Sequence, residues 1–518
     1  MNASPWFIVA NVLLATFMAL SSATVTIVGN ANIQGELALS SPKAQWIQIF
    51  YLLAVNSVVP AANWFAERFG YKRMYGLGVL VFALGSGAAA LATNFWVLGI
   101  VRFIEGIGAG IIFPVGLAMI FRNVPKEKLS LALNLYIAVS FGGGLGLGMP
   151  LSGYFAQFLS WRWPLFLMLP LGLLAAVDCF FRHEETPRQE KGPFDLWGYL
   201  SFVTFIASLL VALSFGALPS TDEGWTSPFI LGLFALAGAA LIITVLIEKS
   251  HPFPLLPLQL FKDPIFVVSS AALFLLGMAL FTSLSASSLF LIEALKYEKF
   301  VTGLICSMYG LAMAGASVLA SQLIRKIPVP ILLLGGLSIL VVSYFLNNQI
   351  TLQSGPGQVL MILFLRGLGV GLSLGPITGL AMHVVPKELG SEGATLLTFF
   401  RQVGVTYGGT VLGILTIKRA IFHAARFSEQ TSTQIPGYRV VWRKMFGQFF
   451  SNLSDKGYLA ARQAKFKIVE NVETQAFIQG QNDALFVFGW VTLGVAVLMA
   501  GLIVHRVMRA RKARSLPE

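Results

Sequence analysis

The chain has 518 residues, of which 56% are hydrophobic and only 11% are charged, and its mean hydropathy is +0.76. A soluble protein of this length would carry about 25% charged residues, so the composition excludes a soluble globular domain and indicates a polytopic membrane protein. The net charge of +13 is compatible with a nucleic-acid partner, but the positions of the basic residues argue against one.

Long apolar runs follow one another along nearly the whole sequence. A membrane-spanning helix needs about 20 mostly apolar residues, because helical hydrogen bonds must satisfy every backbone group inside lipid. By this criterion the sequence predicts an all-α membrane protein with fourteen spans. The predicted spans are residues 6–29, 44–66, 74–92, 95–121, 130–156, 162–181, 195–217, 227–247, 264–291, 301–324, 329–347, 357–384, 392–418 and 484–507.

Basic residues concentrate on one side of these spans. If the N-terminus is cytoplasmic, the inner loops contain most of the Lys and Arg residues. The short outer loops contain only four, Lys43, Arg162, Lys296 and Lys299. This bias follows the positive-inside rule, so we expect a multi-pass protein of the cell (inner) membrane with both termini in the cytoplasm. The basic residues then set orientation, and we expect no nucleic-acid partner.

The turn between the second and third spans is charged. Glu67, Arg68, Lys72 and Arg73 surround Gly70 in this turn. Ion pairs among such residues would hold neighbouring helices in one arrangement and break in another, which provides a two-state element. We therefore interpret the turn as a gating motif, with charges that only set topology as the alternative.

The fourth span contains a carboxylate, Glu105, about ten residues from its start and thus roughly 15 Å deep at 1.5 Å per residue. A charge at a helix centre costs about 2.5 to 3.5 kcal/mol on insertion scales, so it usually faces water or a partner. Arg102 lies three residues earlier on the same helix face and can pair with it. Burial and this guanidinium act oppositely on the proton affinity of Glu105, so water access would control its protonation. We predict that Glu105 and Arg102 couple transport to protons; a structural ion pair and a direct substrate contact are the alternatives.

The fifth span is rich in small residues. Gly144, Gly148 and Ser152 are spaced by four, and such faces let helix backbones approach and slide. Pro150 adds a bend. We expect Gly144, Gly148, Pro150 and Gly153 to form a helix contact that moves during function, although ordinary tight packing explains the pattern equally well.

Two further cations lie within spans, Arg366 in the twelfth and Arg401 in the thirteenth. Together with Arg102 and against one central acid, they leave an excess of about two positive charges in the interior, which favours anionic or neutral amphiphiles over lipophilic cations. We place Arg366 and Arg401 in a substrate cavity. The alternative is that they bind backbone carbonyls or helix ends.

An internal repeat relates the fourth and twelfth spans. Gly106, Gly108 and Gly110 recur as Gly367, Gly369 and Gly371, and Val124–Glu127 recurs as Val385–Glu388, at one offset of 261 (367 minus 106, 386 minus 125). Two six-helix halves alone would give a shorter offset, and two additional spans between the halves explain the surplus. Membrane proteins built from repeated halves around a midplane site are above all secondary transporters.

These motifs resemble the major facilitator superfamily, specifically its fourteen-helix drug/proton antiporter branch, over nearly the whole chain. The loop 63–72 is similar to the pattern G-x-L-A-D-R-x-G-x-K/R, with Asn63 in place of Gly and Glu67 in place of Asp. The other similar segments are 102–109 (R-x-x-Q-G-x-G-A), 148–153 (a degraded G-P-x-x-G-G) and 398–402 (N-x-x-R-Q).

The resemblance implies two bundles that expose a midplane site to each side in turn. Its antiporter branch usually carries an Asp in span one, where this chain has Ser22, and a Gln in span four, where this chain has Glu105. We hypothesise that the coupling acid has moved from span one to span four, and we place Ser22 in the substrate cavity. In the family, the motif of span five is typical of exporters.

We expect three parts along the chain. Residues 1–194 form an N-terminal six-helix bundle, 195–263 form two inserted transmembrane helices and a linker, and 264–518 form a C-terminal six-helix bundle with a long external loop at 419–483. Patches of this loop read as short amphipathic helices. Some pumps of the branch pass substrate to a periplasmic adaptor and an outer-membrane channel, so the loop could dock such a partner or act as a simple lid.

The sequence therefore predicts a proton-coupled antiporter that exports lipophilic or amphiphilic small molecules, such as drugs, fatty acids or organic-acid metabolites. A symporter or facilitator that imports a metabolite and a non-transporting receptor are the alternatives. The pattern Gly371–Gly375 spells a nucleophile elbow but lies inside an apolar span, and neither a Walker loop nor H-E-x-x-H occurs. We expect no enzyme activity, no metal and no cofactor.

Overall fold

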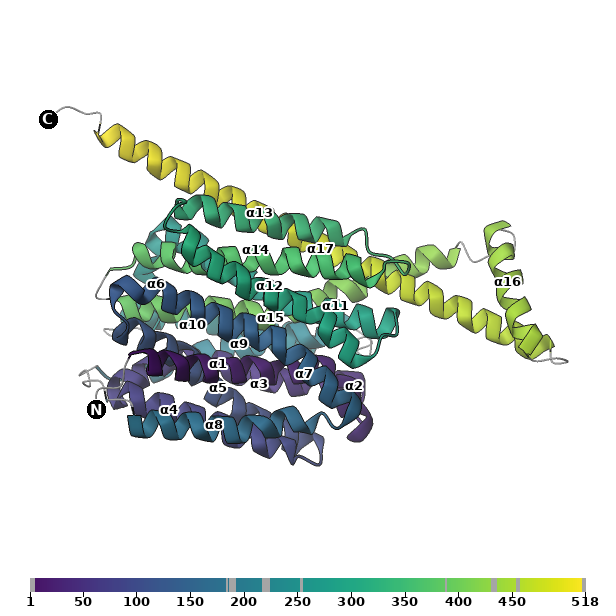
Figure 1. The fold of residues 1–518 in the computed structure, drawn as a ribbon, viewed down its shortest axis with the longest axis horizontal. Coiled ribbons are helices and arrows are strands. Elements are labelled where there is room, and N and C mark those ends of the chain that lie inside the picture. The colour runs from purple at the N-terminus through teal and green to yellow at the C-terminus, as the bar shows by residue number, and fades with distance from the viewer. Residues whose placement is uncertain are drawn as a thin grey trace.

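The computed structural model describes residues 5–182, 185, 192–216, 224–251, 255–386, 389–429, 436–452 and 457–514. Lys387 and Glu388 of the repeated V-P-K-E segment, residues 186–191 of the predicted N-terminal bundle, and residues 217–223 and 252–254 of the predicted inserted part lie outside these ranges. Within them no strand occurs, and the helices pack side by side in a bundle from which helices of the C-terminal part project (Figure 1). The predicted all-α fold is confirmed.

The first six predicted spans correspond to a series of long helices. α6, the π-helical segment η1 and α7 run on from one another and together make the fifth span. The elements are α1 (Pro5–Val28), α2 (Asn30–Glu36), α3 (Ser41–Phe69), α4 (Tyr71–Ala90), α5 (Phe95–Asn123), α6 (Lys126–Leu135), η1 (Tyr136–Gly143), α7 (Gly144–Phe158) and α8 (Arg162–Arg182).

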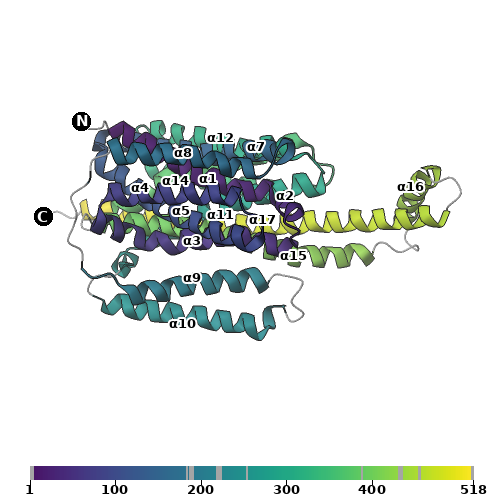
Figure 2. The ribbon, with the colours of Figure 1, turned by 90° about the horizontal axis from the view of Figure 1, so that it is seen from below.

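The remaining elements follow in the same way. They are α9 (Leu196–Gly216), η2 (Gly224–Thr226), α10 (Pro228–Ser250), η3 (Leu258–Lys262), α11 (Pro264–Leu289), η4 (Phe290–Ala294), α12 (Lys299–Leu323), α13 (Val329–Asn347), α14 (Pro356–His383), α15 (Gly390–Glu429), α16 (Pro436–Asn452) and α17 (Gly457–Arg514). α1 begins and α17 ends at the same end of the bundle, which we call the inner end (Figure 2).

Local sequence signals set several helix ends. The side chain of Asn94 accepts a hydrogen bond from Val97 N at the start of α5, and Asp263 accepts one from Ile265 N at the start of α11, as expected of N-cap residues. Gly70 separates α3 from α4 with a φ of 104°, a conformation that glycine adopts at little cost. These signals explain why apolar runs become separate helices.

Thirteen helices of the described chain are long and apolar enough to cross a membrane. They correspond to thirteen of the fourteen predicted spans. The other predicted span, 392–418, lies in α15, which packs within the bundle between α11 and α17 but is too polar to meet the same criterion. Arg401 and Gln402 are part of the reason.

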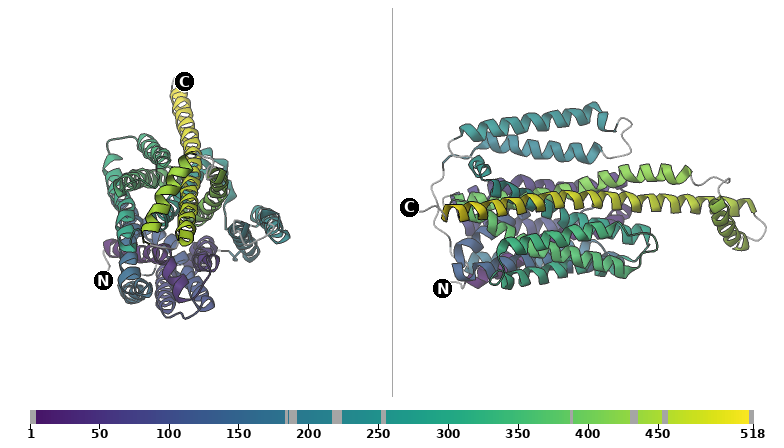
Figure 3. Two further views of the ribbon diagram at one scale, coloured as in Figure 1. Left: turned by 90° about the vertical axis from the view of Figure 1, so that its right-hand side faces the viewer. Right: turned by 90° about the horizontal axis from the view of Figure 1, so that it is seen from above.

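The inserted pair α9 and α10 lies beside the bundle (Figures 2 and 3). α9 touches both α3 and α15: the rings of Trp46 and Phe215 are 5.1 Å apart, and those of Phe202 and Phe399 are 5.0 Å apart. The Tyr407 hydroxyl donates to the backbone oxygen of Ile206 in α9 at 2.9 Å. α9 is therefore anchored to helices from both the N-terminal and the C-terminal parts of the chain.

The segment 419–483, which we expected to be a long external loop with short amphipathic helices, is mostly helical, and its helices are longer than expected. α15 continues to Glu429, α17 begins at Gly457, and the predicted span 484–507 is only part of this 58-residue helix. α16 sits near the outer tip (Figure 1). The segment stays helical because α15 and α17 pack closely, and Asp483 accepts hydrogen bonds from Arg419 at 2.6 Å and His423 at 2.9 Å. Residues 430–435 and 453–456 of the predicted loop lie outside the described ranges.

The repeated glycines make equivalent contacts in the two copies. A Cβ atom on Gly106 would lie 2.4 Å from the backbone oxygen of Tyr51, and one on Gly367 would lie 2.2 Å from that of Tyr309. The hydroxyls of both tyrosines donate to a backbone carbonyl of an adjoining helix, α1 or α11. Both glycines are thus required for the close approach of α5 to α3 and of α14 to α12.

Candidate functional site

Three of the predicted site residues meet between α5 and α1. Glu105, Arg102 and Ser22 are fully buried. Arg102 Nη1 donates to Glu105 Oε2 and to Ser22 Oγ, both at 2.8 Å, and Ser22 Oγ donates to Glu105 Oε1 at 2.5 Å. The carboxylate of the fourth span therefore reaches the position in the first span where the antiporter branch usually has its acid.

Two residues that sequence analysis missed frame this cluster. The Arg102 guanidinium lies over the Tyr51 ring, 4.6 Å from its centroid. Gly85 of α4 makes room, since a Cβ atom there would lie 2.8 Å from Glu105 Cα. Only the tertiary packing of α3, α4 and α5 brings Tyr51 and Gly85 to this point.

Glu105 and Arg102 balance each other's charge in the interior. Arg102 and an ionised Glu105 compensate each other, whereas a protonated Glu105 would leave a buried positive charge without an opposite charge. Such an uncompensated ion is strongly unfavourable in a dry interior.

Arg366 occupies the position in the repeat that corresponds to Glu105 (105 plus 261). It is fully buried, lies over the Tyr344 ring at 4.7 Å and donates from Nη2 to Asn347 Oδ1 at 3.1 Å. Its Nε is 3.4 Å from Ser343 Oγ. These contacts clamp α14 to α13, which agrees with the structural alternative for this residue.

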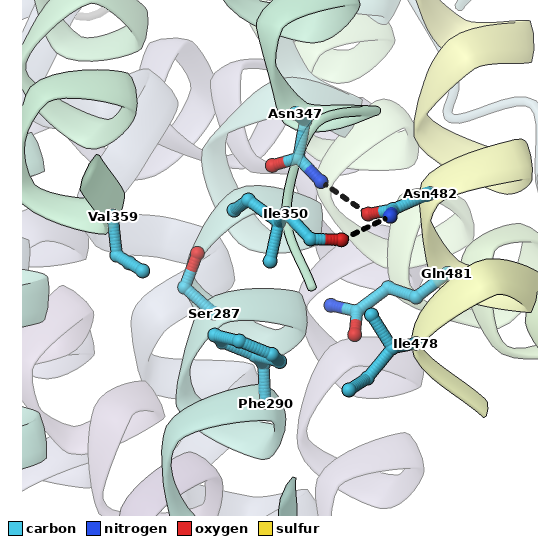
Figure 4. Close-up of a pocket in the computed structure, with 8 residues that line it drawn as sticks. All are labelled: Ser287, Phe290, Asn347, Ile350, Val359, Ile478, Gln481 and Asn482. Carbon is cyan, nitrogen blue, oxygen red and sulfur yellow. Dashed lines mark hydrogen bonds between the residues drawn. The ribbon is translucent and has the colours of Figure 1, made fainter. Parts of the chain in front are cut away.

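A small polar cavity lies beyond Asn347 toward the outer end (Figure 4). Asn347 Nδ2 donates to Asn482 Oδ1 at 3.0 Å, and Asn482 Nδ2 donates to the backbone oxygen of Ile350 at 2.8 Å. Ser287 and Gln481 also line the cavity, whose volume is about 10 Å³. This is about the space that one water molecule requires, so the cavity is too small for an organic substrate in this conformation.

Arg401 of α15 has different surroundings. Its side chain is buried, its guanidinium lies 4.5 Å from the centroid of the Phe141 ring, and Tyr136 lies beside it. The three predicted cavity residues thus have different neighbours: Ser22 contacts Glu105, Arg366 contacts α13, and Arg401 contacts η1.

The gating turn binds to a neighbouring helix. Glu67 is buried, and its Oε1 lies 3.5 Å from Arg122 Nη2 of α5 and accepts from the Tyr71 hydroxyl at 3.3 Å. Arg122 also stacks over the Tyr71 ring at 4.2 Å. Sequence analysis missed Arg122, because it lies at the far end of a different span.

The other residues of the turn do not pair with Glu67 in this structure. Arg68 is exposed, Arg73 pairs with Glu185 at 3.5 Å, and the backbone nitrogen of Lys72 donates to Glu185 at 3.2 Å. A Cβ atom on Gly70 would clash with Glu185, 2.3 Å away. The turn therefore attaches α3 and α4 to α5 and to the segment that follows α8.

The small residues of the fifth span allow close helix contacts on two faces of α7, one toward α1 and the other toward α12. Cβ atoms on Gly144 and Gly148 would lie 2.9 Å from Leu20 Cβ and 2.9 Å from Thr24 Oγ1 of α1. On the other face, a Cβ on Gly310 of α12 would lie 2.2 Å from the backbone nitrogen of Gly146. A further set of backbone-to-backbone approaches joins Gly153 to Lys299, and Gly303 to Met149 and Pro150. α7 is thus wedged between α1 and α12.

Hydrogen bonds join the N-terminal and C-terminal parts of the chain toward both ends. Near the inner end, Asn63 of α3 donates to Thr395 of α15. Near the outer end, Phe300 N of α12 donates to Gln157 Oε1 of α7 at 2.9 Å. Breaking one set while keeping the other would open the bundle on one side only.

An apolar groove opens on the bundle surface where η1 and α7 meet α12. Its volume is about 630 Å³. It is lined by Phe17, Leu135, Ala138, Val139, Gly143, Leu147, Ala314, Gly315, Val318 and Leu319. All of these residues are apolar, so the groove suits a hydrocarbon or aromatic group better than an ion.

Known proteins are similar to this chain in sequence or in fold. The chain is 24% identical over 508 residues to the MFS-type transporter YhcA of Bacillus subtilis (strain 168), covering 98% of this chain and 93% of YhcA. It is 27% identical to the multidrug transporter protein MdtP of the same organism, covering 80% and 75%. The structure of a POT family transporter in complex with 5-aminolevulinic acid matches with a TM-score of 0.60 at 15% identity, over 95% of this chain and 94% of that chain.

A match to a family model confirms the family that the sequence motifs suggested. The model of the Major Facilitator Superfamily matches residues 12–409, well over half of the chain. This family consists of membrane transporters for small molecules and not of enzymes. The chain belongs to the Major Facilitator Superfamily.

Proposed function

We propose that this transporter is a proton-coupled antiporter that exports lipophilic or amphiphilic small molecules by alternating access. The observation that carries the proposal is the buried carboxylate of Glu105, held by Arg102 and Ser22 between α5 and α1. Similarity to the multidrug transporter MdtP supports an exporter with such substrates.

The proposed cycle uses the two charge states of Glu105. A proton that enters from the outer side neutralises the carboxylate, releases Arg102 from its partner and favours the arrangement in which water reaches the cluster. Loss of the proton to the inner side restores the ion pair. With about 100 mV across the membrane, one entering proton contributes roughly 2.3 kcal/mol, enough for about fortyfold accumulation of a substrate.

In the proposed cycle the bundles 1–194 and 264–518 move relative to each other, and the helix pair in 195–263 lies beside them. The contacts between α7 and α12 and between α3 and α15 are the seams at which these bundles separate. Small residues along α7 and α12 permit sliding. The inner end, where α1 begins and α17 ends, faces the cytoplasm of the cell (inner) membrane, as the positive-inside rule requires.

Proteoliposomes that contain the purified protein test this function. We expect an imposed pH gradient, with the acid side at the outer face, to drive uptake of a fluorescent amphiphile toward that face, and substrate addition to release protons across the membrane. Movement of substrate in the same direction as protons would indicate a symporter. Flux without any pH dependence would indicate a facilitator, and absence of flux would favour a receptor.

We also propose that the projection formed by α16 and the outer parts of α15 and α17 docks an acidic periplasmic adaptor, which passes substrate to an outer-membrane channel. α16 carries Arg439, Arg443 and Lys444 and no acidic residue. Its side chains Val440 and Phe450 are exposed. A basic helix with exposed apolar side chains, held away from the bundle (Figure 1), suits a protein partner of opposite charge.

Charge reversal on α16 tests this docking. Replacing Arg439, Arg443 and Lys444 together by Glu should leave flux in proteoliposomes within about twofold of the original, because α16 lies far from the bundle, and should lower the resistance of cells to an exported toxicant at least about tenfold. The matched control exchanges Lys and Arg at the same three positions and keeps full resistance. Full resistance with the reversed charges would instead make the projection a simple lid.

A further inference from the structure

The Arg401 guanidinium is a buried charge without a counter-ion. The side chain is 5% exposed, and neither its Nε nor its Nη2 has a hydrogen-bond partner. No carboxylate of the described residues forms an ion pair with it. A lone cation in a protein interior is strongly unfavourable unless an opposite charge joins it.

The other two arginines within the spans are better compensated. Arg102 leaves the same two nitrogens free, but Glu105 balances its charge. Arg366 donates to Asn347 and Ser343 and belongs to a clamp within the C-terminal helices. Arg401 alone of these three combines an unbalanced charge with a free pair of donors.

The free donors of Arg401 are the pair that suits a carboxylate. Nε and Nη2 lie on one edge of the guanidinium and point their N–H groups in the same direction. This edge donates two parallel hydrogen bonds to the two oxygens of a carboxylate, which is the geometry that distinguishes Arg from Lys in anion recognition.

Groups from the N-terminal part of the chain lie next to the guanidinium. The Phe141 ring packs against the guanidinium, and the Tyr136 hydroxyl lies near Arg401 and Thr16 without a well-formed hydrogen bond of its own. Tyr136 and Phe141 belong to η1, and π-helical segments often mark functional sites. Separation of the bundles would therefore uncover both the guanidinium and a hydroxyl donor.

The apolar groove adjoins the same segment. Ala138, Val139 and Gly143 of η1 line the groove, whereas Tyr136 and Phe141 of η1 lie against Arg401. Arg401 is 11 residues after Gly390 at the inner end of α15, or about 17 Å deep at 1.5 Å per residue. A polar and an apolar subsite thus flank one short segment in the inner half of the bundle.

We propose that Arg401, assisted by the Tyr136 hydroxyl, binds the carboxylate of an amphiphilic organic acid, whose apolar part enters by the groove between η1, α7 and α12. The substrate anion supplies the counter-ion that the protein lacks. This inference rests on the proposed export function and names its substrate class. It also separates two tasks along the bundle, with the anion site in the inner half and the Glu105 cluster nearer the outer end.

Binding of three probes of similar shape tests the assignment on the full chain in lipid nanodiscs. The probes are naphthoate, its neutral isostere naphthalenemethanol and the cation naphthylmethylammonium. We expect naphthoate to bind more tightly than either of the others. Arg401→Gln should weaken naphthoate binding at least about tenfold and leave naphthalenemethanol within about twofold. Tyr136→Phe should weaken naphthoate a few-fold, and Arg401→Lys should retain part of its binding.

Measuring naphthoate and naphthalenemethanol on the same variant distinguishes loss of carboxylate recognition from misfolding, because misfolding would weaken the binding of both probes. Arg366→Gln is the matched control and should keep the original ratio of the naphthoate and naphthalenemethanol affinities. An unchanged ratio in Arg401→Gln, tighter binding of the cation, or no naphthoate binding up to its solubility limit would each overturn the assignment. If one of these results is obtained but flux is still proton-coupled, only the anion site is wrong and the proposed export function stands. If naphthoate binding depends on Arg401 but flux shows no proton coupling, the anion site stands and the proposed coupling is wrong.

Discussion

Glu105→Gln is expected to abolish transport driven by a pH gradient, lowering its initial rate at least about tenfold. Glutamine keeps the shape of the side chain and can still contact Ser22 and Arg102, but it cannot take up or release a proton. The measurement is substrate flux in proteoliposomes with and without an imposed gradient. Substrate exchange at equal pH on both sides should persist, because that process requires binding and conformational change but no net proton movement.

The same substitution leaves Arg102 as an uncompensated buried charge. Removing one partner of a buried pair typically costs about 3 to 5 kcal/mol of stability, so Glu105→Gln should also lower the melting temperature. The double variant Arg102→Gln with Glu105→Gln contains neither charge and should recover most of that loss while remaining uncoupled. Normal gradient-driven flux in either variant would show that another group carries the proton.

Gly310→Val is expected to reduce transport at least about tenfold and to destabilise the protein by about 1 to 3 kcal/mol, the usual range for overpacking. A Cβ atom at this position would lie 2.2 Å from the nitrogen and 2.4 Å from the Cα of Gly146. Both are backbone atoms that cannot turn away, so α12 and α7 must separate. Flux in proteoliposomes and thermal unfolding provide the two measurements.

Gly335→Val in α13, outside the groove, is the matched control. A Cβ atom there has no atom within 4 Å, so the substitution should leave stability and flux close to the original values. Equal effects of the two substitutions would mean that helix propensity, and not the contact of α7 with α12, explains the loss. A harmless Gly310→Val would contradict the proposed role of this seam in alternating access.

Much of the helical architecture could be predicted from sequence, because lipid leaves few alternatives to helices for an apolar run. The pairing of Arg102 with Glu105 could also be predicted, since residues three apart share a helix face. The contact of Ser22 with Glu105 was not predicted, although Ser22 was noted because it aligns where the family usually has an acid. The two successful predictions rest on local sequence patterns.

Contacts between distant segments could not be predicted in the same way. Tyr51 and Gly85 frame Glu105 only because α3 and α4 pack against α5, and Arg122 reaches Glu67 from the end of another span. Only short amphipathic helices were predicted in this segment, and not the long projecting ones. Hydropathy reports whether a segment can enter lipid, and polar residues are equally compatible with a helix in water. Hydropathy alone does not distinguish a polar helix from a polar loop.

α17 is one continuous rod from its outer tip into the bundle. Arg506 anchors it near the inner end by a 2.7 Å hydrogen bond to Asp263, and Asn482 anchors it near the outer end of α13. From Gly457 to Gly480 the outer part of α17 is about 35 Å long at 1.5 Å per residue, so a tilt of about 5° at the anchors would displace its tip by about 3 Å. A helix of this length would convert small rearrangements of the membrane-embedded helices into a movement of α16 and of any partner bound to it. A force applied to α16 would in turn favour one of those arrangements over the other.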